Sequence, residues 1–240
     1  RCSRSFIVTG AADRTFTAHA ETPFLALDAS GALTEARELD GGARIVVTTP
    51  RLSDIARESP FGLGAARLEG ELRQARGTTA IQGQLVARDI DALGRPVSLS
   101  GPVTVSLTDD RFHLAAQLAA PDDAPALFAQ ARLRTELSYD RRRHRFELSE
   151  AELTGDALAL TAQGWVNGGD GEFSGNWRVR RLETLTGDLT GEASGNWRAF
   201  AEDANGARIW TTSRVKARAL AARHQLSRNC SAPRRVSTRG

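Results

Sequence analysis

The sequence predicts a mainly β fold, in which one elongated antiparallel sheet curls to leave a groove and carries one or two short helices. Apolar and polar residues alternate over much of residues 146–198, and a period of two places successive side chains on opposite faces of a strand. The chain contains 22 glycines, which suits frequent turns between strands. The segment Gly175-Asn176-Trp177-Arg178 returns as Gly195-Asn196-Trp197-Arg198, so strands of similar composition follow one another.

Composition supports a thin sheet rather than a thick core. Hydrophobic residues make up 40% of the 240 residues, but aromatic residues only 6%. No apolar run reaches the ~18 residues of a membrane-spanning helix, and no signal peptide is recognisable near the start. Because the sequence has no methionine, we expect an internal piece of a longer protein. Cys2 and Cys230 lie near opposite ends and predict no disulfide framework or metal site.

Charge divides the chain into two parts. Residues 214–240 contain eight basic residues and no acidic one, which leaves 24 of the 32 basic residues, against 29 acidic ones, in residues 1–213. The net charge of +3 therefore comes from the tail. We expect the groove-forming sheet to occupy residues 1–213. Residues 214–240 are predicted to be a basic tail that is disordered or translated out of frame.

The sequence of the first half of the chain predicts strands that are interrupted by one helix. Asp40-Gly41-Gly42 separates two apolar runs, and an Asp-Gly pair in that position predicts a hairpin turn. Residues 50–59 predict one short helix, because Pro50 suits a first helical turn and Leu52 and Ile55 share a face. Strands are then expected again up to residue 118, with Val103 and Val105 alternating with polar residues.

The second half contains one break before the central stretch. Prolines at 121 and 125 interrupt the strands over about residues 121–130, where one helical turn is expected, capped by Asp122 or Asp123. A strand follows at Leu133–Tyr139, and the charged residues 140–145 predict a solvated hairpin loop. The alternating stretch that begins at Phe146 then completes the sheet.

No motif in the sequence predicts catalysis, a cofactor or a metal. Residues 62–67 begin like a dinucleotide-binding GxGxxG sequence but end in Arg67. Residues 168–173 begin like a calcium-binding repeat, but Phe173 stands where an acid is needed and the motif occurs once. The four histidines have no partners at ligand spacing. The arginines of residues 141–145 lack interleaved aromatic side chains, so no nucleic-acid partner is predicted.

The repeated strand texture resembles one protein family. The segments LEGELRQARG, IQGQLVARDID and LRTELSYDRRRHRFELSEAELTGDALALTAQG, together with the Gly-Asn-Trp-Arg pair, are similar to the periplasmic part of TamB-type translocation and assembly module proteins, in the wider AsmA-like group. The resemblance covers about residues 5–212. It implies a taco-shaped, half-open β structure on the periplasmic side of the bacterial inner membrane, held by an N-terminal membrane anchor that this sequence does not contain. It also implies an outer-membrane barrel protein as partner, and a role in outer-membrane protein assembly, secretion or phospholipid transfer.

From these features we expect a non-enzymatic segment whose apolar groove holds lipid. Buried acyl chains gain ~0.8 kcal/mol per CH₂, so a lining of Leu, Val, Phe and Ala suffices without any polar constellation. The candidate lining residues are Val103, Val105, Leu133, Leu137, Phe146, Leu148, Leu158 and Leu160.

Two alternatives remain at this point. A secreted β-solenoid or adhesin would require a regular repeat of ~20–25 residues, which does not persist beyond one copy. A glycan-processing enzyme would require convergent carboxylates, and Glu150 and Glu152 fall on one strand face without a visible counterpart.

Overall fold

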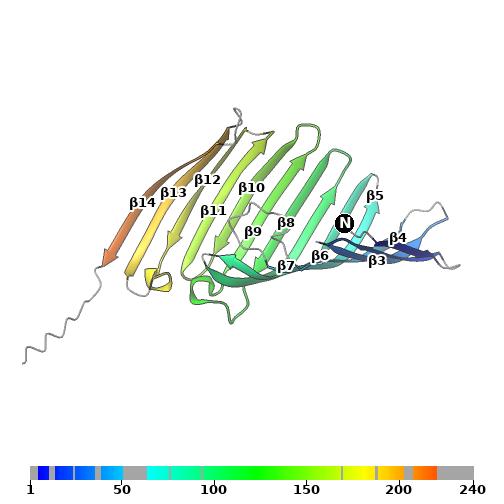
Figure 1. Cartoon of the computed structure of the whole chain (residues 1–240), viewed down its shortest axis with the longest axis horizontal. Coiled ribbons are helices and arrows are strands. Elements are labelled where there is room, and N and C mark those ends of the chain that lie inside the picture. Colours follow the sequence, from blue (N-terminus) through cyan, green and yellow to red (C-terminus); the bar gives the residue numbers. More distant parts are fainter. Residues whose placement is uncertain are drawn as a thin grey trace, which may run out of the picture.

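A computed structural model describes residues 5–10, 14–23, 25–35, 39–50, 64–75, 77–92, 94–168, 170–186, 189–202 and 208–220, the backbone alone at 5–10, 201–202 and 208–220. In these ranges the protein is one 14-stranded sheet whose strands lie in sequence order (Figure 1). The predicted fold class is therefore confirmed: a curled, unclosed antiparallel sheet.

The strands are short at the N-terminal end and longer toward the middle. They are β1 Ser5–Gly10, β2 Thr15–Glu21, β3 Ala26–Leu33, β4 Leu39–Thr49, β5 Ala66–Ala75, β6 Thr78–Ala92, β7 Arg95–Leu107, β8 Arg111–Ala119, β9 Arg132–Asp140, β10 Arg145–Thr154, β11 Leu158–Asn167, β12 Asp170–Val179, β13 Thr190–Glu202 and β14 Arg208–Leu220. Two 3-10 turns, η2 Ala126–Phe128 and η3 Leu182–Thr184, lie in connections between strands.

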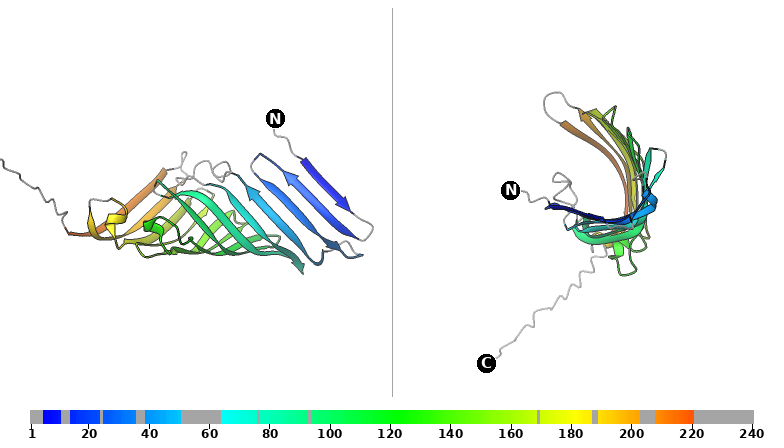
Figure 2. Two further views of the ribbon diagram at one scale, coloured as in Figure 1. Left: turned by 90° about the horizontal axis from the view of Figure 1, so that it is seen from below. Right: turned by 90° about the vertical axis from the view of Figure 1, so that its right-hand side faces the viewer.

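The sheet curves along its strands, so that its cross-section is a crescent (Figure 2). The first and last strands, β1 and β14, each have a neighbour on one side only. Thirteen strand spacings of ~4.8 Å give a length of ~62 Å across the strands. The fold is thus an elongated trough whose long axis crosses the strands.

The strand register separates an apolar face from a polar one. Residues directly opposite each other in an antiparallel pair point to the same face. Leu114, Leu137 and Leu148 form one such row across β8, β9 and β10. The neighbouring residues along the same strands, His113 and Ser138 among them, point to the other face. That face carries cross-strand ion pairs instead of apolar contacts.

The apolar face is the inside of the curl. The side chain of Arg95, at the start of β7, donates a hydrogen bond to the carbonyl oxygen of Leu185 beyond β12, at 3.4 Å. Four strands lie between β7 and β12, so this contact requires the sheet to bend toward its apolar side. Leu127 and Phe128 fill the space enclosed there, with 0% and 5% of their surfaces exposed.

Three local predictions need correction or lie outside the described residues. The predicted end of the sheet at residue 213 is wrong, because β14 continues to Leu220; its register pairs Arg218 with Glu192 and Ala217 with Ala193, so alternation persists. Asp40-Gly41-Gly42 lies inside β4 rather than at a hairpin turn, because Gly41 and Gly42 take positive φ angles within the strand. The helix predicted at residues 50–59 falls largely outside the described residues.

The connection between β8 and β9 has the predicted helical turn but not the predicted cap. The turn is η2, and it begins after Pro125 with no side-chain hydrogen bond to its first amides. Neither Asp122 nor Asp123 caps it. The turn is held instead by the burial of Leu127 and Phe128 in the trough.

Candidate functional site: an apolar groove

A row of mostly small residues forms the floor of the groove. It runs through Ala116, Thr135, Ala151, Ala162 and Gly175, which are paired in turn from β8 to β12. Small side chains let the backbone bend inward without steric conflict. Because they protrude little, the middle of the concave face is the deepest part of the groove. We call this set the floor row.

Larger apolar residues flank the floor row on both sides. On one side lies the closed-side row, Leu118, Leu133, Leu153, Leu160 and Trp177. On the other side lies the open-side row, Val105, Leu114, Leu137, Leu148 and Phe173, followed by a second row of Leu107, Phe112, Tyr139, Phe146 and Val166. The closed-side and open-side rows are four residues apart along β8, β9, β11 and β12, or ~14 Å, and five apart along β10, whose register shifts after Leu148.

A covering loop, residues 120–131, closes one side of the groove. Its Leu127, Phe128 and Ala131 pack into one hydrophobic cluster with Val97, Leu99 and Leu118 of β7 and β8, and with Ala157 before β11. Backbone hydrogen bonds anchor both ends of the loop, since the amide of Ala120 donates to Ala131 and the amide of Asp156 donates to Ala129. On this side the apolar face is an internal core.

The opposite side of the groove has no such cover among the described residues. Leu107 is 45% exposed, and Phe112, Tyr139, Phe146 and Phe173 are only half-buried. Leu160, in the closed-side row, is 37% exposed, so the cover does not extend over that part of the row either. Contiguous exposed apolar side chains of this kind mark a surface that binds another apolar group. The uncovered rows therefore form the candidate binding site.

The register places all eight predicted lining residues on the apolar face. They differ in their surroundings. Val103 is a buried member of the core cluster, and Val105, Leu133 and Leu158 pack against that cluster. Leu137, Phe146, Leu148 and Leu160 are not part of it. We therefore restrict the open groove to the second set and assign Val103, Leu133 and Leu158 to the packed core beneath the covering loop.

Sequence reasoning missed several residues of the same face. Phe112, Leu114, Tyr139, Phe173 and Trp177 share the rows of the predicted residues. The signal for Trp177 was present in the repeat Ser-Gly-Asn-Trp-Arg, which occurs at residues 174–178 and 194–198. In the sheet these two copies pair with each other about Asn176 and Asn196.

This self-pairing places each tryptophan opposite the other copy's glycine. Trp177 is opposite Gly195, and Trp197 is opposite Gly175. A Cβ on Gly175 would come within 2.8 Å of the indole Nε1 of Trp197. The glycine thus provides the space in which the indole lies flat over the neighbouring strand, which explains why the repeat keeps Gly and Trp together.

Charged groups lie on the polar face, where they pair across strands. His113 lies 3.0 Å from Glu136 through Nε2, and Arg178 lies 2.7 Å from Glu192. The hydrogen bond that His19 donates to Asp28 raises the pKa of His19 above its ordinary value, and hydrogen bonds from Arg44 and Arg67 lower the pKa of Glu69. Solvent screens these exposed pairs, so they contribute little to stability, and among the described residues they do not converge on one centre.

Among the described residues no helix is long and apolar enough to span a membrane. In the same ranges, no group of three or more His, Cys, Asp or Glu side chains is arranged to hold a metal ion. No family model, curated protein or solved structure matches the chain.

Proposed function

We propose that the chain is a non-enzymatic segment of a bacterial envelope bridge, whose apolar groove holds phospholipid acyl chains. The observation that supports this most directly is the uncovered apolar face, with Phe146, Leu148 and Leu137 in rows that continue from strand to strand. A globular protein would cover such rows with a second layer. In the part of the chain that the structure describes, a covering layer exists on one side only.

The geometry suits cargo that moves along the trough. The open-side rows present apolar side chains on most strands, with Gly164 of β11 between Leu148 and Phe173, so an acyl chain lying across the strands meets a similar environment along most of its length. Each CH₂ removed from water contributes ~0.8 kcal/mol. On this proposal the contacts along the rows are weak and similar to one another, which favours passage over tight storage.

The resemblance to TamB-type and AsmA-like proteins supports the same proposal from the sequence. It places the segment in the periplasm, with an outer-membrane barrel protein as its partner and outer-membrane protein assembly as a further role. A β-solenoid adhesin fits less well, because every strand pairing in the described residues is antiparallel whereas solenoid coils stack in parallel.

A charge placed in the groove tests the proposal. Leu137→Asp puts a carboxylate between Leu114 and Leu148 on the open side. The loss of one leucine contact, ~1.5 kcal/mol, predicts about a tenfold decrease in phospholipid bound by the whole chain. Bound lipid is measured by extraction and mass spectrometry after incubation with vesicles of phosphatidylethanolamine and phosphatidylglycerol.

The matched control is Ser138→Asp, one residue along the same strand and on the polar face. It is expected to bind as much phospholipid as the unaltered protein. If the unaltered protein binds no lipid above background, or if both variants lose lipid equally, the groove does not hold phospholipid.

A further inference from the structure

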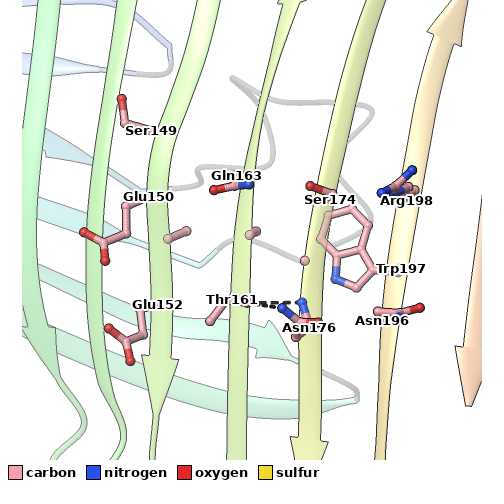
Figure 3. Close-up of a pocket in the computed structure, with 13 residues that line it drawn as sticks. Ser149, Glu150, Glu152, Thr161, Gln163, Ser174, Asn176, Asn196, Trp197 and Arg198 are labelled. Carbon is pink, nitrogen blue, oxygen red and sulfur yellow. Dashed lines mark hydrogen bonds between the residues drawn. The ribbon is translucent and has the colours of Figure 1, made fainter.

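A second hollow lies on the polar face, opposite the groove. It has a volume of about 1130 Å³ and spans β10 to β13 (Figure 3). Its polar lining residues are Ser149, Glu150, Glu152, Thr161, Gln163, Ser174, Asn176, Asn196 and Arg198. Only the backbone of Ala151, Ala162, Gly175 and Trp197 lies between them, because the register points the side chains of this row to the apolar face. Neither the alternation of the strands nor the proposed lipid groove accounts for this hollow.

A β-bulge in β10 brings two carboxylates to this face. The register of β10 shifts after Leu148 against both of its neighbouring strands. An extra residue in one strand re-aims the side chains that follow it. Glu150 and Glu152 consequently join the polar face, while Ala151 and Leu153 join the apolar one. A bulge at this point costs ladder hydrogen bonds, and its effect is to supply acids to the hollow.

The paired Ser-Gly-Asn-Trp-Arg repeats build the opposite side. Asn176 stands directly opposite Asn196, and Ser174 stands opposite Arg198. Asn176 donates from its backbone and side-chain nitrogens to the hydroxyl of Thr161, at 3.1 and 3.4 Å (Figure 3). This holds one amide in place next to the other.

Most of the polar side chains in the hollow have no protein partner. Among the described residues, the side chains of Glu152, Gln163, Ser174, Asn196 and Arg198 make no hydrogen bond or ion pair, in contrast to the paired acids elsewhere on this face. Hydrogen-bonding groups that converge on one hollow without satisfying each other are available to a ligand.

The charges in the hollow balance. Glu150 is 3.5 Å from Arg134, which neutralises it. Glu152 and Arg198 remain, one of each sign. With Arg134 included, the lining residues therefore carry no net charge, and Arg214 of β14 stands next to them in register with Asn196. The amides of Gln163, Asn176 and Asn196 both donate and accept, as do the hydroxyls beside them, and this pattern matches a ligand whose groups also do both.

We propose that this hollow binds a short neutral oligosaccharide, which lies across β10 to β13 for ~14 Å, the width of three strand spacings. Sugar hydroxyls donate to the carboxylate of Glu152, accept from Arg198 and exchange hydrogen bonds with the amides between them. The proposal is independent of the lipid groove, which occupies the other face of the same strands.

The site binds the sugar without cleaving it. Glu150 and Glu152 are two residues apart on one strand, ~7 Å by the strand rise, and both approach a ligand from the same side. Glycoside hydrolysis requires two carboxyl groups that flank the scissile bond. The described residues offer no carboxylate on the opposite side of the hollow, where Asn196 and Arg198 stand.

Titration with defined sugars tests the proposal. Chitotetraose and cellotetraose are titrated against the full chain by isothermal titration calorimetry, and at least one is expected to bind. Asn196→Ala and Gln163→Ala each remove one hydrogen-bonding amide and are expected to weaken binding about 3- to 10-fold. Asn167→Ala, at the exposed end of the same sheet face and outside the hollow, is the matched control and is expected to leave affinity unchanged.

Circular dichroism of each variant shows that the sheet is retained. If neither sugar binds at millimolar concentration, the proposal is overturned. Equal losses of sugar affinity in Asn196→Ala and Asn167→Ala would overturn it as well. A tetrapeptide that binds with the same dependence on Asn196, when neither sugar does, would assign the hollow to a peptide and overturn it as well. Leu137→Asp, which tests the lipid groove, should not change sugar affinity, so the two proposals fail separately.

Discussion

Truncation of Leu127 is the most direct test of how the trough is held closed on one side. The side chain is 0% exposed and packs within the cluster that joins β7, β8 and the covering loop. Leu→Ala removes about three CH₂ equivalents, ~2.4 kcal/mol at ~0.8 each. The cavity left behind adds to this, because the neighbouring strands are fixed by their ladders, and gives a total of ~3–5 kcal/mol.

Urea denaturation followed by circular dichroism measures this loss. If the free energy of unfolding falls by ~2 kcal/mol per molar urea, a loss of ~3 kcal/mol of stability lowers the urea concentration at the unfolding midpoint by ~1.5 M. Leu107→Ala is the matched control, because Leu107 is 45% exposed on the same apolar face, and its loss should stay below ~1 kcal/mol. Equal shifts for the two variants would refute the assignment of Leu127 to a closed core, since a lipid-facing leucine and a core leucine would then be indistinguishable.

Two further substitutions probe the sheet itself. Gly175→Ala places a methyl group against the carbonyl oxygen of Thr161 and the indole of Trp197, and should lower the thermal midpoint by an amount corresponding to ~1–3 kcal/mol of overpacking; an unchanged midpoint would show that the indole does not lie over this glycine. Asp28→Asn replaces the negatively charged acceptor that raises the pKa of His19 above 6.5 with a neutral one. The stabilisation from this pair is complete below about pH 6.5 and disappears as the pH rises through the raised pKa, so NMR titration of the His19 ring should show a lower pKa in Asp28→Asn, and an identical pKa in both proteins would contradict the pairing.

The fold class followed from the sequence because alternation survives in almost every strand. Phe146 and Leu148, or Leu158 and Leu160, show their common face by parity alone. The bulge in β10 did not follow, because a single extra residue changes the face of Glu150 without leaving a compositional mark. The covering loop was recognisable as a break, but its closing role depends on Leu127 meeting Val97 from a distant strand, which no local pattern reveals.

The end of the sheet was misplaced for a different reason. In residues 214–219 the basic residues Arg214, Lys216 and Arg218 alternate with Val215, Ala217 and Ala219. Alanine is only weakly hydrophobic, so this alternation is faint, and the basic residues dominate the composition of the segment. The acid that pairs with this strand, Glu192, lies in β13 at the register position of Arg218. A count of charges along the sequence therefore does not show that a basic residue of one strand stands opposite an acidic residue of the next strand.

The strict sequence order of the strands has a consequence for how the molecule assembles. Since each strand is bonded only to those immediately before and after it in the chain, the strand pairings join neighbouring segments, and each pairing closes only a short loop, which favours rapid formation. The sheet is then nearly one-dimensional, and its stability accumulates hairpin by hairpin as in repeat proteins. Growth by zippering has no built-in stopping point, so hairpins could be added or deleted at either end during evolution with only local effects on the remainder.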